Sequence, residues 1–271
     1  MPEATITGSQ RIGDAFATAR AEGRAALMPY LMAGFPDREA SLAVADAYVD
    51  AGADLVELGI PFSDPLADGP VIHAAATTAL AAGTTLEDAL EICTRIAARV
   101  PVVPMAYANM ILARGAEEFA RLLAEAGAAG AIVPDLPPEE SSDVAAALSE
   151  ARLALVPLVA PTTPPDRLRA ICDAAEGFVY VVSDTRVTGE REDLPPGLSE
   201  LVEAVRGCSP VPVAVGFGIG TPEQAAAVGR MADGVIVGSR LVRAVGEAQG
   251  PEIAAASVRD FIAAAKTAMA A

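Results

Sequence analysis

Apolar segments of strand length recur eight times along the chain, separated by stretches with helical periodicity. Their nearly continuous Val, Ile, Leu and Ala content is typical of strands buried on both faces of a parallel sheet. The predicted strands are residues 27–33, 54–60, 102–108, 129–135, 154–160, 177–183, 211–217 and 233–239. The predicted amphipathic helices between them include residues 38–51, 86–98, 116–126, 139–151 and 222–229. This alternation predicts an α/β fold, a single (β/α)8 TIM barrel forming one domain over residues 1–271.

Features outside the repeat extend this prediction. Residues 8–23 predict an extra N-terminal helix, and residues 246–250 predict a break before a final helix. About forty residues separate the second strand from the third, and a polar segment, 184–196, follows the sixth strand. Both loops leave the carboxyl ends of strands, where barrel enzymes build active sites, so they are candidates for lids. An open doubly wound sheet is the alternative fold, and the count of eight strands favours closure.

Glu57 breaks the apolar pattern of the second strand, between Val56 and Leu58. A buried carboxylate is costly unless it binds a ligand, titrates or pairs with a cation. The structural alternative to a ligand site is therefore an ion pair, inside the barrel, between Glu57 and one of the chain's eighteen arginines. Gly59 shares the face of Glu57 and leaves space for a ligand. The Pro- and Gly-rich loop that follows carries Asp64 and Asp68, which are either turn residues or further carboxylates of the same site.

The charge balance limits the possible partners. Thirty-six acidic and nineteen basic residues give a net charge of −17, without a basic cluster, which argues against nucleic acid and anionic membranes. No secretion signal or membrane span is apparent, and Cys93, Cys172 and Cys208 form no Cys-x-x-Cys pair. We therefore expect three separate, mostly buried thiols and a cytoplasmic location.

His73 is the only histidine and Lys266 the only lysine. A clustered histidine metal site, a Ser-His-Asp triad and a lysine Schiff base are therefore disfavoured, and no metal is expected. Catalysis is expected to depend on carboxylates, with a broad pH profile that lacks a histidine limb. His73 is expected to be a partly exposed polar residue, and Asp135 to cap the following helix rather than line a pocket.

Glycine-rich turns follow the last two predicted strands, at residues 216–220 and 238–239. Glycines allow backbone amides to approach an anion closely, and a helix beginning near Ser239 would add its N-terminal dipole. These turns predict a phosphate cradle of the kind common in barrels, with ordinary tight turns as the alternative.

Residues 56–70 read VELGIPFSDPLADGP, and this segment resembles the signature of the tryptophan synthase α subunit family. The likeness covers nearly the whole chain. Further motifs occur in the family's order at residues 29–37, 107–109, 133–140, 187–189, 216–219 and 238–239.

The resemblance implies retro-aldol cleavage of indole-3-glycerol phosphate to indole and glyceraldehyde 3-phosphate, in tryptophan biosynthesis. It implies that Glu57 is the catalytic glutamate and that Asp68 contacts the indole nitrogen. The positions matching the family's substrate and phosphate contacts are Tyr30, Ile72, Tyr180, Thr188, Gly189, Phe217, Gly218, Gly238 and Ser239. Asp64 and Asn109 match contacts with a β subunit, which implies an α2β2 assembly in which pyridoxal phosphate belongs to β and this chain has no cofactor.

The chemistry of the residues agrees with this implication. Retro-aldol cleavage needs an electron sink, and the indole ring itself becomes one when its C3 is protonated. Arg186 stands where the family usually has glycine and Asp184 where arginine is common, while His73 and Gly220 replace a frequent glutamine and serine. Two alternatives therefore remain: a stand-alone lyase that releases indole, and a catalytically weakened activator of a β subunit.

Overall fold

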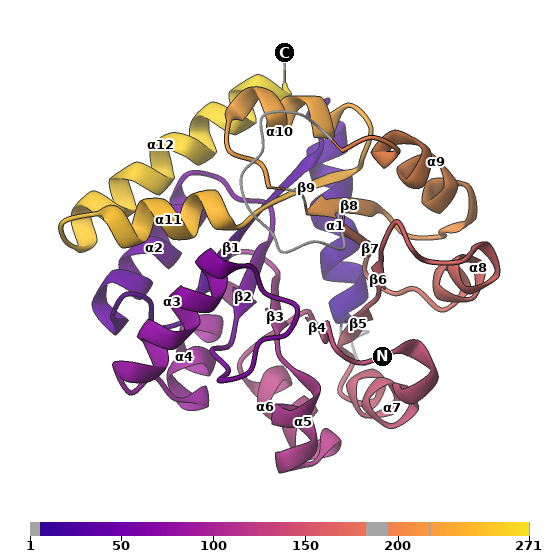
Figure 1. Cartoon of the computed structure of the whole chain (residues 1–271), viewed down its shortest axis with the longest axis horizontal. Helices are drawn as coiled ribbons and strands as arrows, with labels where there is room; N and C mark the ends of the chain where they lie inside the picture. The colour runs from indigo at the N-terminus through magenta and orange to yellow at the C-terminus, as the bar shows by residue number, and fades with distance from the viewer. Residues whose placement is uncertain (1–5, 183–194, 217, 271) are drawn as a thin grey trace, which may run out of the picture.

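The computed structural model describes residues 6–182, 195–216 and 218–270. Within these residues one parallel sheet has the strand order β5-β4-β3-β2-β1-β9-β8-β7-β6, surrounded by helices (Figure 1). Its strands are β1 Ala26–Met32, β2 Val56–Gly59, β3 Val102–Met105, β4 Gly130–Ile132, β5 Ala154–Val156, β6 Leu158–Val159, β7 Val179–Val182, β8 Val213–Gly216 and β9 Gly234–Val237. Each lies within or overlaps one of the eight predicted strands.

The fifth predicted strand is present as two short pieces. β5 and β6 are separated only by Pro157, which has no N–H to donate to a sheet. They form the two edges of the sheet, so continuity of the chain closes the barrel at this point. The carbonyl of Pro157 still accepts a hydrogen bond from the Tyr180 N–H at 2.9 Å. The predicted (β/α)8 barrel is therefore confirmed, with a break in one strand.

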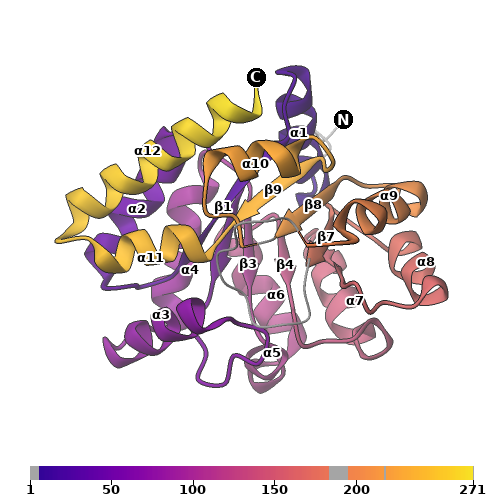
Figure 2. The same cartoon turned by 45° about the horizontal axis from the view of Figure 1, so that its top comes forward.

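The helices are α1 Gly8–Ala21, α2 Arg38–Asp50, α3 Pro70–Ala81, α4 Leu86–Ala97, α5 Ala108–Arg114, α6 Ala116–Glu125, the 3-10 helix η1 Pro138–Glu140, α7 Ser142–Glu150, α8 Pro165–Asp173, α9 Leu198–Cys208, α10 Pro222–Gly229, α11 Ser239–Glu247 and α12 Pro251–Met269. The predicted helix over 139–151 is divided between η1 and α7. Figures 1 and 2 show the C-terminal α12 beside α2, α10 and α11. None of the helices in the described ranges is long and apolar enough to cross a membrane.

The extra N-terminal helix α1 is confirmed, and it fills the base of the barrel. Thr7 and Gln10 form a reciprocal capping box at its start. Ile12 and Phe16 are buried in the cluster inside the barrel, and the Phe16 ring lies 5.8 Å from that of Phe178. The amino-terminal end of the barrel is thus closed by side chains, which leaves the carboxyl end open for a ligand.

The expectation of three separate thiols is wrong for two of the cysteines. Cys93 is a free, buried thiol. Cys172 in α8 and Cys208 in α9 are joined as a disulfide, with their Cα atoms 5.8 Å apart. The two residues are 36 positions apart in sequence, so only the packing of α8 against α9 brings them together.

Candidate active site

A cavity of about 130 Å³ lies at the carboxyl ends of the barrel strands. It is lined by Tyr30, Glu57, Ala67, Asp68, Ile72, Met105, Pro134, Leu158, Tyr180, Val182, Gly216, Gly218, Ile236, Gly238 and Ser239. The structure thus brings together eight of the residues predicted from the sequence: Tyr30, Glu57, Asp68, Ile72, Tyr180, Gly218, Gly238 and Ser239. Thr188, Gly189 and Phe217 lie outside the described residues, as do Asp184 and Arg186.

Glu57 projects into this cavity from β2, where it is aligned with Tyr30 of β1 and Val103 of β3. Its residue exposure is 2%, and its Oε2 has no hydrogen-bond partner among the described residues. Burial, followed by the negative charge of Asp68, raises the pKa of Glu57 to about 8. The alternative of an arginine partner is not supported, because none of the ion pairs found in the described residues includes Glu57. The side chain is therefore a neutral acid at pH 7 that is free to contact a ligand.

Two tyrosines of the cavity wall, Tyr30 and Tyr180, each lie over a glycine of the neighbouring strand. A Cβ placed on Gly59 would lie 1.9 Å from Tyr30 Oη, and one placed on Gly216 would lie 2.4 Å from Tyr180 Oη. Only glycine therefore allows these rings to lie where they do. Burial together with the charges of Asp68 and Glu57 raises the pKa of each tyrosine well above its usual value. Both phenols stay neutral, and Tyr30 Oη has no hydrogen-bond partner in the described part of the chain.

Asp68 reaches the cavity from the loop between β2 and α3, at half-buried depth. Burial raises its pKa to about 6, although a hydrogen bond from Tyr107 and the charge of His73 lower it. Asp68 is therefore largely ionised at pH 7 while Glu57 is neutral. Two nearby carboxyl groups with separated pKa values are the arrangement expected of an acid and an anionic stabiliser.

Tyr107 is a residue of this site to which the sequence interpretation gave no role. Its hydroxyl accepts a hydrogen bond from the Ala67 N–H at 3.1 Å and hydrogen-bonds the Asp68 carboxyl group. Its ring stacks on Phe62, with centroids 5.2 Å apart. Tyr107 thus holds the Asp68 loop at three points. The signals available in the sequence were its place shortly after β3 and its part in the family motif at residues 107–109.

The opposite end of the cavity is formed by glycines and the start of a helix. Gly218 follows β8, and Gly238 immediately precedes α11, whose first residue is the buried Ser239. A Cβ on Gly238 would lie in ordinary contact with Tyr30 and Ile72, at 3.7 Å or more, so the backbone there borders the same wall as these two side chains. The predicted helix start at Ser239 is confirmed, and its free N–H groups suit an anion.

Asp64 and Asn109 lie outside the cavity, on the adjoining surface, and both are exposed. The exposed hydrophobic side chains Leu66 and Leu112 accompany them, at 89% and 64% exposure. Leu112 follows Asn109 by three positions on α5 and so shares its face. The stacked rings of Phe62 and Tyr107 place the loop that carries Asp64 and Leu66 next to the start of α5, the helix that carries Asn109 and Leu112.

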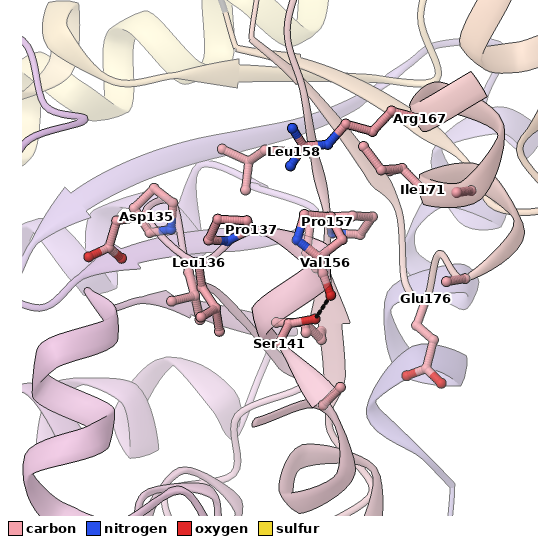
Figure 3. A pocket seen from close by; sticks show the side chains of 17 residues that line it. Asp135, Leu136, Pro137, Ser141, Val156, Pro157, Leu158, Arg167, Ile171 and Glu176 are labelled. Atoms are coloured by element: carbon pink, nitrogen blue, oxygen red, sulfur yellow. Dashed lines mark hydrogen bonds between the residues drawn. The ribbon is translucent and has the colours of Figure 1, made fainter. Parts of the chain in front are cut away.

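Two further expectations are resolved here. His73 lies in the first turn of α3 and is exposed, as expected. Asp135 is a capping residue, but not of the helix that follows it. From the loop after β4, its Oδ1 accepts a hydrogen bond at 2.8 Å from the N–H of Ala108, the first residue of α5, which follows the neighbouring strand β3. It also borders a second cavity, of about 420 Å³, between α7 and α8 (Figure 3).

The larger cavity is not the better candidate for catalysis. No buried, unpaired carboxyl group was found along its wall, whereas the smaller one contains Glu57 beside Asp68. Perturbed ionisable groups that converge on one space mark a reactive site more directly than volume does. Over residues 6–182, 195–216 and 218–270, no cluster of His, Cys, Asp and Glu is suited to hold a metal ion.

Comparison with known proteins identifies the family. Residues 16–270 match the family described as tryptophan synthase alpha chain. The chain is 48% identical over 248 residues to the tryptophan synthase alpha chain of Roseiflexus castenholzii, covering 90% of this chain and 95% of that protein. It is 45% identical over 262 residues to that of Thermosynechococcus vestitus, with 96% and 97% covered. A structure of Mycobacterium tuberculosis tryptophan synthase matches with a TM-score of 0.90 at 41% identity, over 96% of this chain and 98% of that chain. The chain therefore belongs to the tryptophan synthase alpha chain family.

Proposed function

We propose that this chain cleaves indole-3-glycerol phosphate into indole and glyceraldehyde 3-phosphate, a carbon–carbon lyase reaction of tryptophan biosynthesis. The observation that carries the proposal is the buried Glu57, unpaired among the described residues and in one cavity with Asp68. The reaction balances without an added reagent. A proton is added at indole C3, a proton leaves the adjacent glycerol hydroxyl, and the bond between C3 and the carbinol carbon breaks to give the aldehyde.

Glu57 serves both proton transfers in this proposal. With a pKa of about 8 it is a neutral acid at pH 7, so it is able to protonate C3. The carboxylate left by that transfer is buried and weakly solvated, which makes it a strong base for the neighbouring hydroxyl proton. One group with a raised pKa thus returns to its starting state in each turnover.

Asp68 stabilises the cation formed between these two steps. Protonation at C3 gives the ring nitrogen positive charge and makes its N–H a strong donor. An ionised Asp68, at a pH above about 6, accepts that hydrogen bond most strongly when the charge is present. Its contribution therefore appears in the transition state more than in substrate binding.

The remaining wall residues bind the two ends of the substrate. Tyr30, Ile72 and Tyr180 surround the ring in this proposal, with Phe217 from beyond the described residues. Gly218, Gly238 and Ser239, with Gly189 of the undescribed segment, form the phosphate cradle. The N-terminus of α11 supplies N–H donors and dipole there, which is needed in a chain whose net charge is −17.

An indole-release assay on the purified chain tests the proposal, with two aspartates of the same loop as a matched pair. Asp68→Asn removes the carboxylate that faces the cation, so the lyase rate should fall by about 100-fold. Asp64→Asn changes an exposed residue outside the cavity, so the rate of the isolated chain should change by less than about twofold. No indole release by the unaltered chain would overturn the proposal.

We further propose that the surface bordered by Asp64, Leu66, Asn109 and Leu112 docks a β subunit in a cytoplasmic α2β2 assembly. Two exposed leucines beside polar groups are typical of an interface core with a polar rim. Pyridoxal phosphate is assigned to that β subunit, where indole would be consumed, and no cofactor is assigned to this chain.

The effect of a β subunit separates the alternatives. If the two subunits work together, adding a cognate β subunit should raise the lyase rate of the unaltered chain, and Leu112→Glu should abolish the increase while preserving the basal rate. An unchanged rate with β would favour the stand-alone lyase. A weakened activator would show little lyase activity alone but would still raise the activity of β.

A further inference from the structure

The larger cavity lies where the barrel strand is broken. It lies between α7 and α8 beside Pro157, the residue that separates β5 from β6, and it is open to the surface. Pro134 and Leu158 belong to its wall and also to the wall of the catalytic cavity. The two spaces are therefore neighbours that share a partition. Its volume of about 420 Å³ is within the range of small-molecule sites.

The walls of this cavity are apolar and rigid. Four prolines belong to its lining, Pro134, Pro137, Pro138 and Pro157, and Leu155 and Ile171 supply aliphatic surface. Proline rings cannot rotate about φ, so the lining is largely preformed. Flat, preformed apolar walls suit an aromatic ring system, because little side-chain entropy is lost when it binds.

Arg167 is the one cationic side chain in the lining. Figure 3 shows it extending from α8 toward Leu158 across the labelled group. Among the residues that the structure describes, its guanidinium donates a hydrogen bond from Nη2 to Glu139 Oε2 at 2.9 Å. The two side chains are 44% and 63% exposed, so this ion pair is weak and easily exchanged.

The other polar groups of the lining are directed elsewhere. Asp135 accepts the Ala108 N–H, and Ser141 donates its hydroxyl to the Pro138 carbonyl at 2.9 Å. Glu176 is exposed. Figure 3 shows its carboxylate and that of Asp135 on opposite sides of the lining residues, with Pro137 and Pro157 between them. The charge available to a ligand is therefore the positive charge of Arg167.

We infer that this cavity binds a small aromatic monocarboxylate of one or two rings. The rings pack on the proline and aliphatic wall, and the carboxylate takes the planar guanidinium of Arg167 in place of Glu139. A single cation matches a single negative charge, which favours a carboxylate over a phosphate dianion. This inference is independent of the proposed lyase activity, because it concerns binding in a separate space.

Methyl NMR of the full chain with naphthalene-1-acetate as the probe tests the inference. The Ile171 methyl reports on this cavity, and the Ile72 methyl reports on the catalytic one. A saturable shift at Ile171 is expected. Naphthalene-1-acetamide has the same shape without the charge and should bind about tenfold more weakly.

Matched variants complete the test. Arg167→Gln should weaken binding of the acid by about tenfold and abolish its advantage over the amide. Arg169→Gln is the control, because Arg169 lies on the same helix and pairs only with the exposed Asp166 in the described structure. Ala170→Trp should fill the cavity and remove the Ile171 shift, with folding checked by thermal unfolding.

Three results would overturn the inference. These are a probe shift at Ile72 but not at Ile171, equal affinity of the acid and the amide, and unchanged affinity of Arg167→Gln. All three results come from binding measurements alone. A failure of the lyase assay would not change them, so the aromatic carboxylate site and the lyase activity are tested separately.

Discussion

Asp54 and Glu57 lie on either side of the start of β2, and both side chains are largely buried. Asp54 pairs with a cation, whereas in the described part of the chain Glu57 does not. Asp54 is 9% exposed and receives two hydrogen bonds from the buried Arg24, at 2.5 and 2.8 Å, plus the Leu27 N–H at 2.8 Å. Lys266 Nζ lies 3.9 Å away. Glu57 has the raised pKa of a carboxyl group without a cation.

The difference follows the two ends of the barrel. Residues before a strand, such as Arg24 and Asp54, lie at the amino-terminal end, where the barrel is closed and these two charges are paired. Glu57 lies further along the strand, where the cavity begins. A buried carboxylate that is paired with a cation is compatible with a stable fold. A buried carboxyl group without a cation has a raised pKa, which is a property expected of a group that transfers protons in an active site.

Glu57→Gln should produce the largest change, in opposite directions for activity and stability. Loss of the proton donor should lower kcat/KM by about a thousandfold or more. Because the folded pKa of about 8 exceeds the unfolded 4.5, ionisation disfavours the folded state as pH rises from 4.5 to 8. The variant should therefore be more stable at pH 7, by at most about 3 kcal/mol.

Urea unfolding at two pH values checks the stability part. The gain should be large at pH 8 and should nearly vanish at pH 3, where the Glu57 carboxyl group of the parent is protonated in both the folded and the unfolded state. A variant that is less stable than the parent at pH 8 would show that Glu57 is compensated like Asp54, and the comparison would fail.

Arg24→Met should be costly for stability and nearly neutral for chemistry. It leaves Asp54 buried without its main partner, which should lower the free energy of unfolding by about 3–5 kcal/mol. Arg20→Gln is the control, because that exposed arginine pairs with Asp233 at the surface and should cost less than about 0.5 kcal/mol. Chemical unfolding measures both. An equal effect of the two variants would contradict a special role for the Arg24–Asp54 pair.

The sequence predicted the carboxyl-end site better than the features that depend on packing. Glu57 was recognisable because it interrupts an apolar strand, and the strands because parallel sheets are buried on both faces. Tyr107 was noticed only as part of the family motif at residues 107–109, and its contact with the Asp68 loop could not be read from the sequence. Asp135 caps α5 because β3 and β4 are neighbours in the barrel. The Cys172–Cys208 pair depends on the packing of α8 and α9, two helices for which the sequence analysis gave no bounds.

The pH profile of the lyase should report the ionisation of both Asp68 and Glu57. The active form has Asp68 ionised and Glu57 protonated, so the rate should rise as pH passes about 6 and fall as it passes about 8. Each unit beyond either limit should reduce kcat/KM about tenfold. This replaces the broad profile expected from the sequence. A rate that stays constant from pH 5 to 9 would contradict the assignment of both groups.

Tyr107→Phe should shift only the acidic limb of the pH profile, the rise in rate near pH 6 that is assigned to Asp68. The hydrogen bond from Tyr107 lowers the pKa of Asp68, so its loss should raise that pKa and shift the limb to higher pH. A fall in kcat/KM of about five- to tenfold at pH 7 is expected. Phe62→Leu removes the ring contact while keeping the hydroxyl, so a limb shift in that control would show that loop position, rather than the hydrogen bond, controls Asp68.

His73→Gln should have the smallest effect. His73 is exposed on α3 and influences the site only because its charge lowers the pKa of Asp68. The substitution should change kcat/KM at pH 7.5 by less than about twofold and move the acidic limb slightly upward. A tenfold loss at pH 7.5 would mean that the only histidine takes part in proton transfer. The pair of carboxyl groups would then be insufficient, and the contrast between Glu57 and Asp54 would no longer explain where the chemistry lies.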